Sequence, residues 1–205
     1  MLLLRYLKCS IEVMGSVEKL VQSLINRVDI CNTLIKDEEI LLQIHHVGEM
    51  LKSTVYSGAM VLICGNGGSA AEAQHMAGEI VGRFLMERDG LPALALTADT
   101  ATLTAVGNDY GYDELFARQV TAFKDSAKLL FLLSTSGNSK NLLKAALRAK
   151  TYGIKTIGLL GRDGGALKEL CDFPIIVPSW YTPEIQEVHL AIIHMLCECV
   201  DGEWR

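Results

Sequence analysis

A histidine and a glutamate four residues apart, His75 and Glu79, follow a glycine-rich turn by about two turns of an expected helix. Residues at this spacing project from the same helix face, so the imidazole and the carboxylate are neighbours. Such a pair can exchange protons with a substrate or offer nitrogen and oxygen ligands to a metal ion. It is also common on ordinary helix surfaces, so its meaning depends on its surroundings.

The last expected helix is apolar except for a few polar side chains, namely Gln186, Glu187, His189 and His194. Buried polar groups require partners, so these residues point to a site or a hydrogen-bond network. Gln186 and His194 are separated by about 12 Å of helical rise and roughly 80° of rotation, so both reach one site only if their side chains lean together. His189 is alternatively a buried structural histidine. His45 and His46 are adjacent, diverge by about 100° and receive no role.

The glycine turn, Cys64-Gly65-Asn66-Gly67-Gly68-Ser69, separates an apolar run from a helical pattern. Its glycines let backbone N–H groups approach an anion, and Ser69 and Glu72 have capping-box spacing. The string also satisfies a loose dinucleotide fingerprint. However, Asp99, the acidic residue considered for a ribose contact, lies 31 residues past Gly68 instead of about 20. A tight turn without a ligand is the other interpretation.

A second loop, Ser134-Thr135-Ser136-Gly137-Asn138-Ser139, carries four hydroxyl side chains, and we call it the hydroxyl loop. Hydroxyls and amides at a helix N-terminus can bind phosphate without a cationic patch, which suits a chain with a formal net charge of −5. In the alternative, Ser139 is only an N-cap and the rest is a polar turn. The density of hydroxyls favours the phosphate site.

These loops need a framework that gathers strand ends. Apolar runs of strand length occur at residues 59–64, 93–96, 129–133, 155–160 and 173–177. Helical patterns alternate with them at residues 69–84, 113–123, 139–152, 166–170 and 182–200, the last with Thr182 as N-cap and Pro183 at the first helical position. The order predicts an α/β fold, a doubly wound, flavodoxin-like sheet of five parallel strands with helices on both faces. Ligands of such sheets bind beyond the carboxyl ends of the strands.

Two amphipathic helices precede the sheet, with apolar residues at helical spacing from Val17 to Val28 and from Ile40 to Leu51, the second after Asp37 as N-cap. We expect a single domain over residues 1–205, with residues 1–57 as an N-terminal helical extension. The apolar stripes of these two helices are wider than one sheet face requires, and the mean hydropathy of +0.26 is high for a domain of 205 residues. We therefore expect apolar surface to be buried between subunits.

Composition argues against several classes of protein. The longest uncharged stretch, residues 53–71, contains nine Gly, Ser, Thr or Asn among its nineteen residues, so no membrane span is expected. The apolar residues at the start of the sequence are followed at once by Arg5, which leaves no apolar stretch long enough for a secretory signal. We therefore expect a cytoplasmic protein. The sequence contains no run of Lys or Arg, which argues against a nucleic-acid partner. The six cysteines contain no CxxC pair and are expected to be reduced.

Taken together, these features resemble the sugar isomerase (SIS) domain family and, within it, the phosphoheptose isomerases. The resemblance spans nearly the whole chain. It rests on Cys64-Gly-Asn-Gly-Gly-Ser69, Gln74-His75-x-x-x-Glu79, Gly107-Asn108-Asp109, the hydroxyl loop, Asp163-Gly-Gly165 and Ile185-Gln186-Glu-x-His189-x-x-x-x-His194. It implies conversion of D-sedoheptulose 7-phosphate to D-glycero-D-manno-heptose 7-phosphate, the first step towards nucleotide-activated heptose for surface polysaccharides such as lipopolysaccharide. It also implies a homotetramer with active sites near subunit interfaces.

The resemblance also assigns roles. Glu79 is implied as the base that moves a proton between C1 and C2 through an enediol, and His194 as its acid/base counterpart. The implied sugar contacts are Asn66, Gly67, Gly68, Asn108, Asp109 and Gln186. The implied phosphate contacts are Ser134, Thr135, Ser136 and Ser139. Zinc, found in some members, would be bound by His75, Glu79, Gln186 and His194, and no nucleotide cofactor is implied. A zinc-bound carboxylate is a poorer base, so the two roles of Glu79 compete.

Two alternatives remain at this point. One is a non-catalytic SIS-domain protein that binds a replication-initiator partner, although such proteins lack the acid/base pair that Glu79 and His194 supply. The other is a different sugar-phosphate isomerase, acting on an aminosugar or a pentose phosphate. The lack of appended modules argues against several of these enzymes.

Overall fold

The computed structural model describes residues 2–202, and side chains from residue 15 onward. Contacts divide the chain into two units, Met1–Glu38 and Glu39–Arg205. The first unit is the long helix α1 (Leu2–Ile35), which begins well before the expected start at Val17. Its apolar side chains are largely exposed: Val17, Leu20, Val21, Leu24, Ile25 and Val28 keep 45–67% of their surface.

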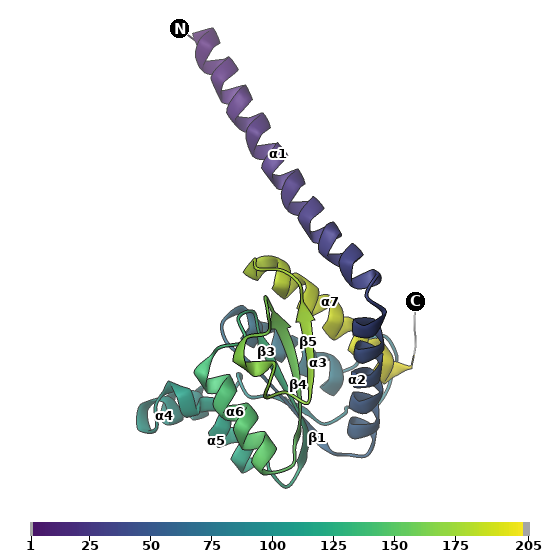
Figure 1. The fold of residues 1–205 in the computed structure, drawn as a ribbon. Coiled ribbons are helices and arrows are strands. Elements are labelled where there is room, and N and C mark those ends of the chain that lie inside the picture. Colours follow the sequence, from purple (N-terminus) through teal and green to yellow (C-terminus); the bar gives the residue numbers. More distant parts are fainter. Residues whose placement is uncertain (1, 203–205) are drawn as a thin grey trace. The chain divides into compact units, whose positions relative to one another are not determined.

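The second unit alternates strands and helices as expected (Figure 1). After α2 (Glu38–Tyr56), its elements are β1 (Met60–Gly65), α3 (Gly68–Val81), β2 (Ala93–Ala95), α4 (Thr100–Asp109), the 3₁₀ helix η1 (Tyr112–Glu114), α5 (Leu115–Ala122), β3 (Ala127–Ser134), α6 (Lys140–Thr151), β4 (Lys155–Gly161), η2 (Gly165–Leu167), β5 (Phe173–Val177) and α7 (Thr182–Asp201). The five strands are parallel in the order β2-β1-β3-β4-β5. This confirms the predicted doubly wound sheet.

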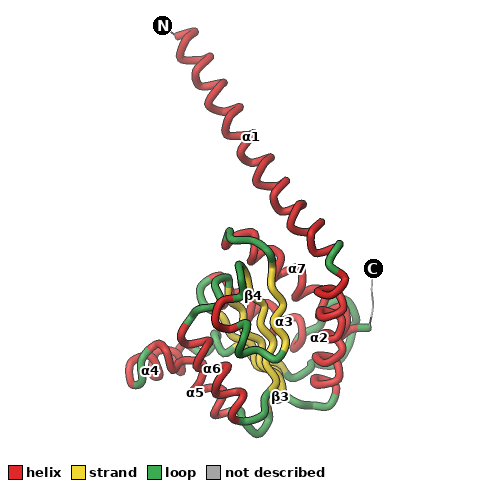
Figure 2. Tube along the Cα trace, viewed as in Figure 1, coloured by secondary structure: helices red, strands yellow, loops and turns green. Residues whose placement is uncertain are grey.

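Helices cover both faces of this sheet, which Figure 2 shows as a yellow layer between red helices. Both faces of the central strand β3 are buried, as a parallel sheet requires, and Leu130 to Leu133 have no exposed surface. One face packs against α5 and α6, whose apolar side chains form a continuous core with Leu62, Leu130 and Leu132. On the other face, α3 packs against α7 and against β1.

Some local expectations are wrong. The sequence pattern missed α4, because in this Ala- and Thr-rich helix only Val106 is buried and no apolar stripe forms. Asp99, the candidate ribose contact, is the N-cap of α4, and its side chain accepts from the N–H groups of Ala101 and Thr102.

Three helix boundaries also differ from expectation. No capping box forms at Ser69, because α3 already begins at Gly68 and has Gly67 as its N-cap. Thr182 is the first residue of α7, and Tyr181 is the N-cap. The segment expected as a helix at 166–170 is reduced to the short turn η2.

Among the described residues, no helix has both the length and the apolar content that crossing a membrane requires.

Candidate active site

The glycine turn and the hydroxyl loop lie side by side, because they follow the carboxyl ends of the paired strands β1 and β3, where Gly65 aligns with Leu133. A cavity of about 210 Å³ opens between them, which we call the hydroxyl cavity. It is lined by Asn66, Gly68, Ser69, Leu133, Ser134, Thr135, Ser136, Ser139, Thr182 and Gln186. It therefore gathers all four predicted phosphate contacts and three of the predicted sugar contacts. Thr182 and Ser69 were not predicted.

The hydroxyl loop is held by its own side chains. Ser134 Oγ accepts a hydrogen bond from the N–H of Gly137 at 3.0 Å, and Ser136 Oγ accepts one from Asn138 at 3.3 Å. Asn138 Oδ1 in turn accepts from the N–H of Ala166 at 3.0 Å. Both serine oxygens act here as acceptors, so their O–H groups remain available as donors to a phosphate.

The electrostatics of the hydroxyl cavity come from backbone and hydroxyl groups. None of the described residues that line it is charged. Helices α3 and α6 both begin at its wall, and the N-terminus of each carries a partial positive charge and N–H groups without helical partners. The cavity can therefore bind an anion in a protein that is acidic as a whole.

Asn66 is fixed by partners distant in sequence. Its amide exchanges two hydrogen bonds with the buried Asn141, at 2.9 and 2.8 Å, and its Oδ1 also accepts from Tyr112 at 2.9 Å. Asn66 stands between the hydroxyl cavity and a second cavity of about 210 Å³, which has apolar walls at Leu103, Leu115 and Phe116. The sequence indicated Asn66 as a contact residue, but not the side chains that orient it.

The first turns of α3 and α7 meet at Gly68. A Cβ at this position would overlap Gln186 Nε2 and would lie 2.9 Å from Gln186 Cδ. Gly68 is therefore the residue that lets Gln186 reach the wall of the hydroxyl cavity. Its neighbour Gly67 has a φ of 57°, a conformation that favours glycine.

Further along the same two helices, three side chains converge. His75 Nε2 lies 3.2 Å from Glu79 Oε1 and 3.0 Å from His194 Nε2. Phe84 stacks on the His194 ring, with centroids 5.5 Å apart and planes inclined by 22°. The structure thus brings His194 to the His75–Glu79 pair across 119 residues of sequence.

This cluster suits a metal ion. The ligand atoms of His75, Glu79 and His194 all lie within 4.8 Å of one another. Two imidazole nitrogens that face each other repel through their lone pairs unless a proton or a cation lies between them. Two nitrogens and one carboxylate oxygen form a typical zinc donor set, with a fourth position open to substrate. The residues therefore fit zinc. The fourth implied ligand, Gln186, contacts Gly68 and stays a prediction.

Asn108 and Asp109 are not gathered with the others. They are exposed at the end of α4, and Asn108 Nδ2 donates to Asp109 Oδ1 at 2.9 Å. Neither lines the two cavities at the glycine turn. Their sugar contacts stay a prediction.

Glu72 and His189 are two of the buried titratable groups on the site helices. Glu72, one turn before His75, is 9% exposed, and burial raises its pKa to about 7. Among the described residues its Oε2 has no hydrogen-bond partner, and the sequence predicted no role for Glu72 beyond a cap. Glu72 is four residues before the apolar Met76 and therefore shares its helix face, and this spacing was the sequence signal that Glu72 is buried. His189 has no exposed surface, and burial lowers its pKa to about 4, so it is neutral as a structural histidine would be.

The chain is similar to known proteins of one family. Residues 26–161 match the family model described as the SIS domain. A phosphoheptose isomerase from Helicobacter pylori (strain P12) is 50% identical over 175 residues, which cover 82% of this chain and 91% of the relative. The chain belongs to the phosphoheptose isomerase family of SIS-domain proteins.

Other phosphoheptose isomerases agree in sequence and in structure. The one from Geobacter sulfurreducens is 52% identical over 165 residues, which cover 80% of this chain and 87% of the relative. The structure of a phosphoheptose isomerase from Francisella tularensis superposes with a TM-score of 0.86 at 37% identity, covering 92% of this chain and 99% of that one. Membership of this family makes the chain a sugar-phosphate isomerase with the SIS fold, as the sequence motifs predicted.

Proposed function

We propose that this enzyme converts D-sedoheptulose 7-phosphate to D-glycero-D-manno-heptose 7-phosphate through an enediol. The observation that carries the proposal is the arrangement of α3 and α7. Both helices begin at the uncharged hydroxyl cavity and then bring Glu79, His75 and His194 together. Relatives about 50% identical that carry the name phosphoheptose isomerase support this substrate.

The layout matches a sugar with its phosphate at one end and its reacting carbons at the other. Gln186, at the cavity, and His194, in the cluster, are separated by about 12 Å of helical rise. A phosphate held by Ser134, Thr135, Ser136 and Ser139 would leave the sugar chain to extend along the two helices. Asn66, Gly67, Gly68 and Gln186 are proposed to contact it there, with Asn108 and Asp109 as further predicted contacts.

The chemistry needs one base and one second proton carrier. We assign Glu79 to remove a proton from C1 of the ketose and to return it to C2. We assign His194 to transfer a proton between the oxygen atoms on those two carbons. The net change shifts one proton along carbon and one along oxygen, so no redox cofactor is required.

Zinc is part of the proposal, with His75, Glu79 and His194 as ligands and Gln186 as the predicted fourth. When bound, the ion would act as a Lewis acid on the sugar oxygens. Glu79 Oε1 is the oxygen that faces His75. The second carboxylate oxygen is thereby left for proton transfer, which eases the competition between the two roles of Glu79.

Elemental analysis of protein purified without chelator should therefore find about one zinc per chain. Removal of the metal should lower activity, and added zinc should restore it. Protein in which His75 is replaced by alanine is the control and should retain little zinc. Full activity in metal-free protein would show that the cluster works without the ion.

A double variant, Ser134→Ala with Ser139→Ala, should raise KM for the sugar phosphate at least about tenfold, because hydrogen bonds to a charged group contribute about 1.5–3 kcal/mol each. Turnover should change less, since the proton carriers are untouched. Steady-state kinetics measure both quantities. Ser126→Ala is the matched control, because the side chain of that serine donates to the carbonyl of Phe123 at the other end of β3. An unchanged KM in the double variant contradicts the phosphate assignment.

We also propose a cytoplasmic homotetramer with active sites near its interfaces. The exposed apolar residues of α1, such as Leu20, Leu24 and Val28, support association, because a helix with such a face is normally covered. Light scattering at micromolar concentration should return about four times the chain mass. A mass near 22.4 kDa would contradict the tetramer.

A further inference from the structure

A buried ion pair lies where the two site helices end. The side chain of Asp201, the last residue of α7, has no exposed surface, and that of Arg88 is 10% exposed. Arg88 Nε donates to Asp201 Oδ1 at 2.9 Å. Burial opposes ionisation of Asp201, but hydrogen bonds from backbone N–H groups and from Arg88 outweigh it and hold its pKa below the ordinary value. Breaking a buried pair of this kind leaves a charge without its partner.

The other nitrogens of Arg88 cap the carboxyl end of α3. Nη2 donates to the carbonyl of Glu79 at 2.9 Å, and Nη1 donates to that of Ile80 at 2.8 Å. Carbonyls in the last turn of a helix lack helical partners, and α3 has no basic residue in its own last turn. Arg88 therefore supplies the missing cation and holds the backbone of Glu79 itself.

Asp201 holds the loop that carries Phe84. Its Oδ2 accepts from the N–H groups of Leu85 at 2.7 Å and Met86 at 2.9 Å. Phe84 directly precedes these residues and stacks on the His194 ring. Asp201 lies two turns beyond His194 on the same helix, about 10 Å along and roughly 20° around. The carboxylate thus fixes the aromatic ring that supports His194.

The two helices run in the same direction and are joined along their length. Gly68 meets Gln186 at their beginning, and His75 meets His194 further along. The Arg88–Asp201 pair connects their ends. The ion pair thus links α3 and α7 at the end that carries Glu79 and His194, away from the hydroxyl cavity.

We propose that Arg88 and Asp201 are positioning residues that hold the Glu79 carboxylate and the His194 imidazole in the geometry required for proton transfer. The proposal rests on the proposed function, in which these two groups are the base and its counterpart. Neither Arg88 nor Asp201 lines the hydroxyl cavity. Loosening the pair should therefore slow proton transfer more than it weakens phosphate binding, since a misplacement of about 1 Å can cost on the order of 10²-fold in rate.

The test uses two variants of the full chain and steady-state kinetics with sedoheptulose 7-phosphate. Arg88→Lys keeps the charge but cannot make the forked hydrogen bonds to the two carbonyls. Phe84→Leu leaves the ion pair intact and removes the ring from His194. Each should lower kcat roughly 10- to 100-fold and change KM less than about threefold.

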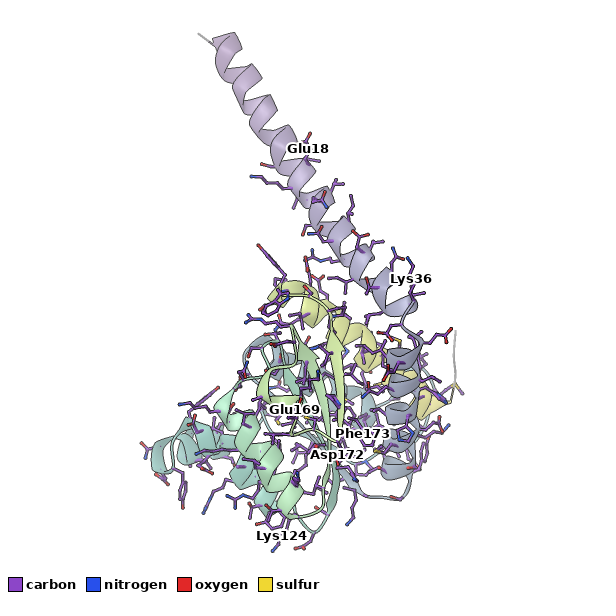
Figure 3. The ribbon with its side chains drawn as sticks, in the orientation of Figure 1. Glu18, Lys36, Lys124, Glu169, Asp172 and Phe173 are labelled. Atoms are coloured by element: carbon purple, nitrogen blue, oxygen red, sulfur yellow. The ribbon has the colours of Figure 1, made fainter. Side chains whose placement is uncertain are left out.

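Asp172→Asn is the matched control. Asp172, labelled in Figure 3, binds Lys155 at 3.2 Å and the N–H of Thr156 at 2.9 Å, where β4 begins. It therefore combines an ion pair with a backbone donor, as Asp201 does, but these partners lie on β4 and not on α3 or the Phe84 loop. This variant should keep the wild-type kcat.

Wild-type kcat in folded Arg88→Lys overturns the proposal. So does an equal loss of kcat in an Asp172→Asn protein with a similar drop in Tm, because general destabilisation would then explain both. If Arg88→Lys fails to fold, Phe84→Leu decides in the same way. Failure of the proposed function looks different: the wild type is inert, or Glu79→Gln is fully active, and the positioning role then falls with it.

Discussion

Replacing Glu79 with glutamine should lower turnover by about 10²- to 10⁴-fold, the usual contribution of a positioned base. Glutamine has nearly the same shape but cannot accept a proton from carbon. The side chain is about one-quarter exposed, so the variant should fold and assemble like the wild type. KM should change less than kcat. Steady-state rates, together with Tm and zinc content for each protein, separate loss of the base from loss of the metal.

Glu87→Gln is the matched control, because Glu87 also forms an i,i+4 pair, with Arg83, but its side chain is 89% exposed. It should keep wild-type turnover. The wild type should also exchange solvent deuterium into C1 or C2 of the sugar, since an enediol exposes the proton to water. Wild-type turnover in Glu79→Gln would place the base elsewhere. A wild type inert towards every sugar phosphate would favour the non-catalytic, partner-binding alternative.

The sheet was predictable because buried parallel strands read as uninterrupted apolar runs. The run at 129–133 lies inside β3 (Ala127–Ser134). The predicted run is shorter than the strand because the exposed Lys128 interrupts the apolar pattern near the start of the strand. α4 was not predictable for the opposite reason. It buries only Val106, so its sequence has no periodic apolar signal.

Local spacing determined one half of the site and tertiary packing the other. His75 and Glu79 meet because residues four apart share a helix face, which the sequence shows directly. His194 joins them only through the packing of α7 on α3. The same holds for Asn66, whose partners Asn141 and Tyr112 are 75 and 46 residues away. No local pattern contains such contacts.

The hydroxyl loop offers a second large effect, at Gly137. This residue has a φ of +66°, and a Cβ there would overlap the carbonyl of Gly164, which is backbone and cannot rotate away. Gly137 also donates its N–H to Ser134 Oγ, so a shift of its backbone moves a proposed phosphate contact. Gly137→Ala should therefore lower the free energy of unfolding by more than the roughly 1–2 kcal/mol that a left-handed alanine costs, and should raise KM.

Gly153→Ala separates the two causes. Gly153 has nearly the same φ, +69°, but apart from its chain neighbours no atom of the described residues lies within 4 Å of an added Cβ. It should therefore lose only the backbone cost of about 1–2 kcal/mol and keep the wild-type KM. Denaturant unfolding and substrate kinetics on both variants measure the difference. Equal losses of stability with an unchanged KM in both would mean that the overlap at Gly164 is relieved without moving Ser134, and that the tight approach of these two loops does not hold the phosphate site in place.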